Sequence, residues 1–595
     1  MEQGETFDFR KASKLMPLSL ALRIVAREEI EVCLSQAQLT DNTAHEACLA
    51  LATRWLHNCL EAGDGSRHSC CNRRPGYGEV QLPSRLIYCG NSENSNAAKL
   101  CSKEDVLPDT NYLTFSHSWG REVVFSLEKD NLASLRTEIP LDRLSRTFQD
   151  AITVTKRLGF EYIWIDSLCI IQDSHDDWVI EGSRMSEVYS NATLNIAATG
   201  FADGKRGFLA SRDPALALPH QVTLEVDSPW FRALGGSEHY ICSVFWDGEV
   251  ENAPLNRRGW VRQERLLSPR TLHFGRNQLY WECSGLAASE MFPTGFVAGF
   301  NIKPKSAQLF PWRARTLEEE HPCVVWERLV PVYSRARLSF ESDKLVAISG
   351  IARVVQESLR DQSLATDYLA GLWKDSLLQE LLWYVPVGNE PTRIPVKSRA
   401  PTWSWASLDA EINFVIEAET VPIVSDLFGS ATGHIRLKGP LKKIRDFFKV
   451  DDETGLLSIP CDGLDSSLDL FPDITQDPFS EQRCPFSIHT PGSNSDDRTG
   501  CTAHPSEFLY LMPIISPDTE HLGQGITITG LALSRTCGTK GEFYRQGLFY
   551  IYAKRDNALD IKELFKLGGD VNEDDVNEDD VEIYHGPMEY TIKIV

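Results

Sequence analysis

The sequence contains no apolar run that approaches the roughly 20 residues needed for a membrane-spanning helix. Charged residues interrupt the apolar stretch near the N-terminus, and no small-residue cleavage site follows it. A secretory signal has an uninterrupted apolar stretch followed by such a cleavage site. We therefore expect a soluble, cytoplasmic protein with no membrane span.

Positive charge is also in short supply. The chain has 60 lysines and arginines against 84 aspartates and glutamates, which gives a net charge of −24. Such a surplus of negative charge repels the phosphates of nucleic acids and anionic lipids, and no local basic patch offsets it. We therefore expect no binding to nucleic acid.

Signatures of several common function classes are missing as well. The chain has no nucleotide-binding P-loop, no recognisable repeat domain and no G-x-S-x-G elbow. Residues 570–582 repeat a short acidic unit that lacks an apolar face, so we expect a solvated tract with no packing role. Calcium binding is the alternative for this tract, although EF-hand spacing is absent.

The 15 cysteines, an odd number, follow no repeating spacing, and many lie inside apolar runs. This usage is typical of reduced core thiols in an intracellular protein. Cys59, His68, Cys70 and Cys71 are of the types that bind zinc. Their spacing matches no zinc template, so we expect ordinary thiols there and no metal site, with zinc as the alternative.

A length of 595 residues is too great for one hydrophobic core and predicts several domains. Hydrophobic periodicity and turn signals indicate four regions. These are a helical leader (1–90), an α/β core (91–290), a mainly helical extension that ends in a WSWAS strand (291–410), and a β-rich region (411–595) with a loop insertion (472–500).

The central region has the sequence pattern of a βαβ crossover sheet. Three apolar runs rich in β-formers, at residues 112–115, 162–165 and 192–198, alternate with segments of helical period. We therefore predict an α/β fold with a central, mostly parallel sheet, flanking helices, and helical and β-rich additions toward the C-terminus.

Polar residues follow these predicted strands. Because the carboxyl ends of parallel strands meet at one edge of a sheet, Ser116, His117, Asp166, Ser167 and Thr199 are expected to gather there. A turn role for Asp166, bonded to nearby backbone N–H groups, is equally compatible with the sequence.

Residues that flank this edge complete the expected crevice. Trp119 is expected to plug it, and Gly120 allows the strand a tight exit. The loop after the third strand carries Arg206 and Arg212, which could meet an anionic ligand, although surface solvation is the commoner explanation.

One carboxylate lies on an apolar helical stripe. Glu181 falls three residues after Trp178 and four before Met185, on the inward face of a predicted helix. A buried carboxylate is costly unless it is paired or protonated, so it is either a structural ion pair or a functional group. For Arg258, Glu264 and Arg265, further along the chain, the expectation is a half-buried ion-pair network.

Five linked segments resemble the heterokaryon incompatibility (HET) domain proteins of filamentous fungi. They are YLTFSHSWG, LSRTFQDAITVTKRLGFEYIWIDSLCIIQDSHDDW, MSEVYSNATLNIAATG, RRGWVRQERLLSPRTLHF and APTWSWASLD. The resemblance implies non-self recognition and programmed cell death after fusion of unlike hyphae, with a protein partner from another incompatibility locus or through self-association.

The same resemblance implies a TIR-like or flavodoxin-like core. Several TIR domains hydrolyse NAD with a glutamate that follows a tryptophan on a helix, and Trp178 and Glu181 are the matching positions. In this hypothesis NAD is a substrate, no cofactor is needed, Glu181 is catalytic, and Arg206 or Arg212 holds the pyrophosphate.

Two other hypotheses stand beside NAD cleavage. One is a non-catalytic module that signals by self-association. The other is a hydrolase that uses Ser116, His117 and Asp166, which is disfavoured because adjacent residues on a strand point to opposite faces of the sheet.

Overall fold

In the computed structural model the chain forms two compact units, residues 1–320 and 321–595. The residues it describes are 21–37, 39–63, 66–69, 71–72, 81–90, 98–120, 125–223, 238–244, 246–296, 302, 321–364, 367–386, 392–395, 397–415, 420–422, 426–429, 433–445, 449–450, 457–460, 467–473, 508–517, 526–536, 539–553, 581–586 and 589–595.

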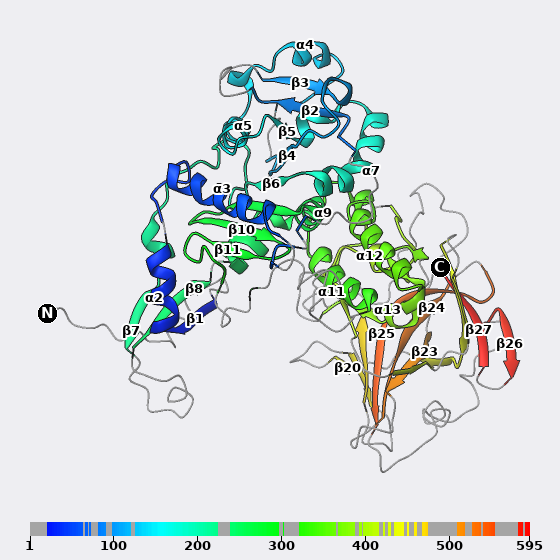
Figure 1. The fold of residues 1–595 in the computed structure, drawn as a ribbon. Coiled ribbons are helices and arrows are strands. Elements are labelled where there is room, and N and C mark those ends of the chain that lie inside the picture. Colours follow the sequence, from blue (N-terminus) through cyan, green and yellow to red (C-terminus); the bar gives the residue numbers. More distant parts are fainter. Residues whose placement is uncertain are drawn as a thin grey trace. The chain divides into compact units, whose positions relative to one another are not determined.

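The first unit is built on an eight-stranded mixed sheet (Figure 1). The strands, in spatial order, are β11 (Ala287–Ser289), β10 (Leu279–Cys283), β9 (Arg270–Phe274), β6 (Leu194–Ala197), β4 (Leu113–Ser116), β5 (Tyr162–Trp164), β2 (Arg85–Tyr88) and β3 (Lys99–Ser102). The four central strands, from β9 to β5, are mutually parallel, and two antiparallel strands follow on each side.

The three predicted core strands are confirmed as β4, β5 and β6, which are neighbours in the sheet. The expectation of a mostly parallel sheet is wrong for the edges. Tight connections such as Gly275–Arg276–Asn277 turn the chain directly back on itself, which forces antiparallel pairing, whereas parallel pairing needs a long crossover. The TIR-like or flavodoxin-like topology stays a prediction.

Helices cover both faces of the central strands. α5 (Arg146–Arg157) packs Phe148 against Phe115 of β4, whereas α7 (His175–Asn191) packs Tyr189 against Trp164 of β5. Trp164 pairs in register with Thr114, so the side chains of neighbouring positions 114 and 115 face opposite helices.

Local signals explain where these helices begin and end. Ser145 caps α5 by accepting a hydrogen bond from the Phe148 N–H, and Gly159, at φ 84°, supplies the left-handed residue that ends it. The remaining helices of this unit are α2 (Arg27–Gln36), α3 (Glu46–Leu60), α4 (Leu132–Thr137), α6 (Asp166–Cys169) and α9 (Gly259–Leu267).

The leader differs from its prediction. We expect helix near the start of the leader, but β1 (Ala21–Ala26) forms a small antiparallel sheet with β8 (Glu238–Val244), which also pairs with β7 (His220–Thr223). The apolar side chains at positions 22, 24 and 25 fit either period, and the partner strand decides between them.

The second unit joins helices to a large antiparallel sheet. Its helices are α11 (Pro322–Ser334), α12 (Ser349–Asp361) and α13 (Leu377–Glu380). Its sheet comprises β16 (Thr420–Pro422), β17 (Asp426–Gly429), β18 (Ile435–Gly439), β19 (Lys442–Arg445), β20 (Lys449–Val450), β21 (Leu457–Pro460), β22 (Ser467–Pro472), β23 (Phe508–Pro517), β24 (Ile526–Arg535), β25 (Glu542–Ala553), β26 (Ile583–Gly586) and β27 (Glu589–Ile594). This confirms β-rich structure toward the C-terminus.

Two predictions in this unit are wrong in detail. The WSWAS segment is not a strand: Trp405–Ser407 forms a 3₁₀ turn capped by the Ser404 hydroxyl, with the indole of Trp405 buried and bonded to the Gly371 carbonyl. The extension predicted to be mainly helical also contains short strands, namely β12 (Tyr368–Leu369), β13 (Leu372–Trp373) and β14 (Trp383–Tyr384), the last paired with β15 (Asn413–Phe414).

Two further predictions fall mostly outside the described residues, namely the insertion beyond Asp473 up to residue 500 and the acidic tract at residues 570–580. Val581 and Glu582, which end the predicted tract, are described, and Glu582 pairs with Arg436 at 2.8 Å. In the part of the chain that is described, no helix has the length and apolar character needed to cross a membrane.

Truncation of the central strand tests this core. Leu113 is fully buried in β4, whereas Leu107 is 73% exposed. We expect Leu113→Ala to lower the free energy of unfolding by about 2–5 kcal/mol, because it removes buried surface and leaves a cavity. Leu107→Ala should change it by less than about 0.5 kcal/mol. Urea denaturation measures both, and equal losses would contradict the assignment of Leu113 to the core.

Candidate functional site

A buried cluster of polar side chains lies at the carboxyl end of β4. The Ser116 hydroxyl donates a hydrogen bond to Oε2 of Glu264 on α9 at 2.5 Å, and it lies 3.0 Å from the side-chain amide of Asn195 on β6. The Tyr189 hydroxyl, from α7, donates to the same Glu264 oxygen at 2.9 Å. One carboxylate therefore joins β4, α7 and α9.

Glu264 titrates far from the ordinary range of a glutamate. The pKa of its carboxyl is raised to about 7, mainly by burial; the charge of Arg258 opposes the rise and the charge of Asp166 adds to it. The hydroxyls of Ser116 and Tyr189 favour the ionised form. Among the residues that the structure describes, Glu264 makes no ion pair, so this carboxyl can exchange a proton near neutral pH.

His117 lies on the opposite face of the strand from Ser116. Its ring stacks on Phe115 and on Trp119 and meets Phe148 edge-on, at centroid distances of 5.2, 6.3 and 4.9 Å. Burial lowers the pKa of His117 to about 4, although its Nδ1 lies 3.8 Å from Asp166. The separation of Ser116 from His117 agrees with the argument against a serine–histidine hydrolase.

Asp166 connects the two sides of this edge. Its Oδ2 accepts a hydrogen bond from the Trp119 indole at 3.0 Å, and its Oδ1 accepts from the Ser167 backbone N–H at 2.7 Å. The carboxylate is thus bonded to nearby backbone, as the turn interpretation predicts, and also faces His117. Ser116, His117, Trp119, Asp166 and Ser167 are therefore neighbours in the structure.

The neighbouring loops also meet at this edge. Gly120 has φ 73°, and a Cβ built there would lie 3.8 Å from Asp203 and Gly204, so the loops after β4 and β6 are adjacent. Arg206 is exposed on the second loop. Thr199 instead contacts Nδ1 of His273 on β9 at 2.9 Å.

Glu181 is buried on α7, as the helical stripe predicts, and is 1% exposed. Its Oε1 lies 3.9 Å from Arg184, a distance without a hydrogen bond. Trp178 packs edge-on against Trp260 of α9. Burial raises the pKa of the Cys169 thiol to about 12, and the charges of Glu181 and Asp166 add to this effect, which puts both carboxylates near α6.

Arg212 lies elsewhere in the unit. Its buried guanidinium forms two hydrogen bonds with the Glu290 carboxylate, and its Nε donates to the Thr40 carbonyl. These donors are already engaged, which leaves Arg206 as the arginine of that loop that is open to an anionic ligand.

The predicted ion-pair network is corrected by the structure. Arg265 pairs with Glu251 at 2.6 Å and with Glu282 at 2.8 Å, while Glu264 turns to hydroxyl groups. Sequence reasoning therefore missed Glu264, Tyr189 and Asn195 as members of the site. A signal was present, because Glu264 lies three residues from both Val261 and Leu267, which are buried on the same helix.

The fold and this cluster define an α/β domain with a buried, titratable carboxylate at the carboxyl edge of its parallel strands. Residues 112–264 match the family model of the heterokaryon incompatibility protein (HET). The match runs from just before β4 to Glu264 within α9, and it supports a heterokaryon incompatibility domain in this part of the chain. No curated protein and no solved structure matched the chain.

The raised pKa of Glu264 predicts a specific dependence of stability on pH. The folded state holds this proton more tightly than the unfolded chain, so stability is fully present below pH 4.5 and is lost as pH rises through about 7. Glu264→Gln should remove on the order of 3 kcal/mol of this decline. Urea denaturation at pH 5, 6, 7 and 8 measures it, and parallel curves for both proteins would contradict the shift.

For His117 the predicted dependence of stability on pH has the opposite sign to that for Glu264. Its folded pKa of about 4 lies below the ordinary 6.5, so stability is present above pH 6.5 and is lost as pH falls toward 4. His117→Phe keeps an aromatic ring and should flatten this acid limb by on the order of 3 kcal/mol. Unfolding measured between pH 4 and 7 checks it, and an unchanged acid limb would show that folding does not lower the pKa of His117.

Proposed function

We propose that this heterokaryon incompatibility domain acts in non-self recognition by starting cell death, as a NAD glycohydrolase. Protein partners are a product of another incompatibility locus or further copies of the chain. The domain match supports the incompatibility-related role. The buried polar edge of the sheet supports the enzymatic part.

One observation carries the enzymatic proposal. Within the described residues, the buried polar atoms without a hydrogen-bond partner include Nε2 of His117, Oγ of Ser167 and Oε2 of Glu181. Leaving a buried polar atom unsatisfied costs about 1–3 kcal/mol. Three such atoms near Asp166 and α6 are expected in a binding site where a polar ligand supplies the missing hydrogen bonds.

The chemistry of NAD cleavage fits buried carboxylates. The bond between C1′ of the ribose and the nicotinamide nitrogen breaks, its electron pair leaves with the nicotinamide, and the ribose carbon becomes cationic. Water then adds to C1′ and gives up a proton. The step needs an anion near C1′ and an acceptor for that proton, and it needs no cofactor.

The environments of Glu181, Glu264 and Arg206 suit them to three different roles in this reaction. Glu181, whose Oε2 has no partner among the described residues, stabilises the cationic ribose carbon. Glu264, with a pKa of about 7, accepts the proton from water at neutral pH. Arg206, exposed on the adjoining loop, receives the pyrophosphate.

Measurement of nicotinamide release by the purified full chain tests the proposal. We expect Glu181→Gln and Glu264→Gln each to lower the rate at least about a hundredfold, because each removes a charge or proton acceptor that acts in the transition state. Glu187→Gln is the matched control. It lies on the same helix as Glu181 and is partly exposed, and it should keep the rate within about twofold.

Thermal unfolding of every variant separates lost chemistry from lost folding. Undiminished release in folded Glu181→Gln would remove that residue from the reaction, and undiminished release in both variants would reject the assigned site. No NAD consumption by the wild type at any protein concentration would reject the enzymatic proposal and leave the domain assignment in place.

A second candidate is the non-catalytic module that signals by self-association. Val179 and Ile180, on the same helix as Glu181, are 49% and 55% exposed, which is unusual for two adjacent apolar residues. In this alternative, toxicity in a yeast host persists in Glu181→Gln and is lost in Val179→Glu. Light scattering would show concentration-dependent assembly without loss of NAD.

A further inference from the structure

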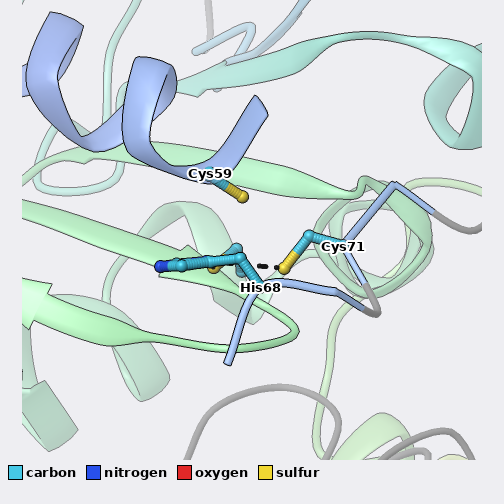
Figure 2. Close-up of side chains that lie close together, drawn as sticks. Cys59, His68 and Cys71 are labelled. Carbon is cyan, nitrogen blue, oxygen red and sulfur yellow. Dashed lines mark hydrogen bonds between the residues drawn. The ribbon is translucent and has the colours of Figure 1, made fainter. Parts of the chain in front are cut away.

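Four side chains of types that bind metals lie close together, and none of them belongs to the polar cluster. Sγ of Cys59, a ring nitrogen of His68, Sγ of Cys71 and Sγ of Cys283 all lie within 4.8 Å of one another. Each residue is at most 5% exposed. Figure 2 shows Cys59, His68 and Cys71 directed toward a common point.

We propose that these four side chains form a structural zinc site. The ligand set of three thiolates and one imidazole is one that zinc uses in closed, tetrahedral sites. Neither the domain assignment nor the glycohydrolase proposal requires this site, because all four ligands lie outside residues 112–264.

The distances suit a single ion. Nδ1 of His68 lies 3.7 Å from Sγ of Cys71 and 3.4 Å from Sγ of Cys283. Ligands at the zinc–sulfur and zinc–nitrogen bond lengths, placed at tetrahedral angles, lie about 3.5–3.8 Å apart. The four ligand atoms lie within 4.8 Å of one another, so the widest pair must close by up to about 1 Å when an ion binds.

The backbone brings the ligands together for reasons that can be read locally. Cys59 is in the last turn of α3, and His68 and Cys71 share a turn closed by a 2.9 Å bond from the Cys71 N–H to the His68 carbonyl. Cys283 ends β10. A Cβ at Gly285 would lie 2.0 Å from the Arg67 carbonyl oxygen, so only glycine lets the β10–β11 turn approach the His68 loop.

A cation outside the ligand set balances the charge. Zinc with three thiolates and one neutral imidazole carries a net charge of −1. Nε of Arg270 donates to Sγ of Cys59 at 3.1 Å, so a guanidinium contacts the site directly. Asn72 supports the same loop by donating from its amide to the Leu60 carbonyl at 3.0 Å.

The chemistry of the set selects its ion. Thiolates and imidazole favour zinc over calcium or magnesium, which take oxygen ligands. Four protein ligands leave no open coordination position, so the ion is structural and not catalytic. It joins α3 and its following loop to the antiparallel side of the sheet, and its binding energy contributes to folding.

Metal analysis of the purified full chain tests the site. We expect about one zinc per chain in the wild type and less than about a tenth in Cys71→Ser and Cys283→Ser, because each loses a ligand. Cys101→Ser is the matched control, a buried free cysteine outside the cluster, and should keep its zinc. His68→Cys preserves four ligands and should also keep it.

Measurements on the wild type keep the test decisive if a variant fails to fold. Chelation should lower the melting temperature, added zinc should restore it, and cobalt in its place should give the absorption bands of tetrahedral thiolate coordination. The proposal is overturned if the wild type neither contains nor takes up zinc. Full zinc content in both serine variants, or a disulfide among Cys59, Cys71 and Cys283 in the wild type, would overturn it equally.

Discussion

The carboxylate of Glu264 imposes the main physical constraint on the first unit. It is buried and accepts hydrogen bonds from the hydroxyls of Ser116 and Tyr189, so the three residues join β4, α7 and α9. An ionised carboxylate in such a place is costly without a cation in contact, and the raised pKa is the physical response to that cost. Because a satisfied polar network fixes the positions of its members, the helices and the strand end are held in one arrangement.

Arg265, next to Glu264, shows the contrasting case in which buried carboxylates are paired with a cation. Burial alone would lower the pKa of Arg265, but the charges of Glu251 and Glu282 raise it well above its ordinary value. That network has its charges compensated and is not expected to exchange protons near neutral pH. Glu264 and Arg265, neighbours on α9, thus lie in opposite electrostatic environments. Glu264, which has no compensating charge in contact among the described residues, lies at the edge formed by the carboxyl ends of the parallel strands.

The central strands could be predicted from sequence because their signals are local and agree with one another. Runs of β-formers at β4, β5 and β6 and a capped, glycine-terminated α5 need no partner to be recognised. The gathering of His117, Trp119 and Asp166 followed from parallel topology alone. Glu264 was assigned to the wrong partners because its neighbour Arg265 was the obvious one in sequence, and only the fold shows that their side chains diverge.

Other features depend on contacts between distant segments. β1 is a strand because β8 pairs with it, with Ile24 opposite Ile241, 217 residues later in the chain, and no local pattern predicts that pairing. The cysteine cluster also depends on tertiary structure. The spacing of Cys59, His68 and Cys71 matches no zinc-binding template, and the fourth residue, Cys283, comes from β10. Sequence spacing recognises a metal site when its ligands are adjacent in pairs, and here the fourth ligand is supplied by tertiary structure.

The two clusters occupy opposite ends of the parallel strands, which separates their consequences. Cys283 pairs in register with Arg270, the first residue of β9, and Arg270 also donates to the carbonyl of Thr193, immediately before β6. Ser116 and Asp166, in contrast, lie at the carboxyl ends of β4 and β5. Strands of four or five residues at about 3.3 Å per residue put roughly 13–16 Å between the two ends. Loss of the metal would therefore act on Glu264 only through the rigidity of the sheet, so a change in stability without a change in the pKa of Glu264 is the natural outcome of an intact strand core.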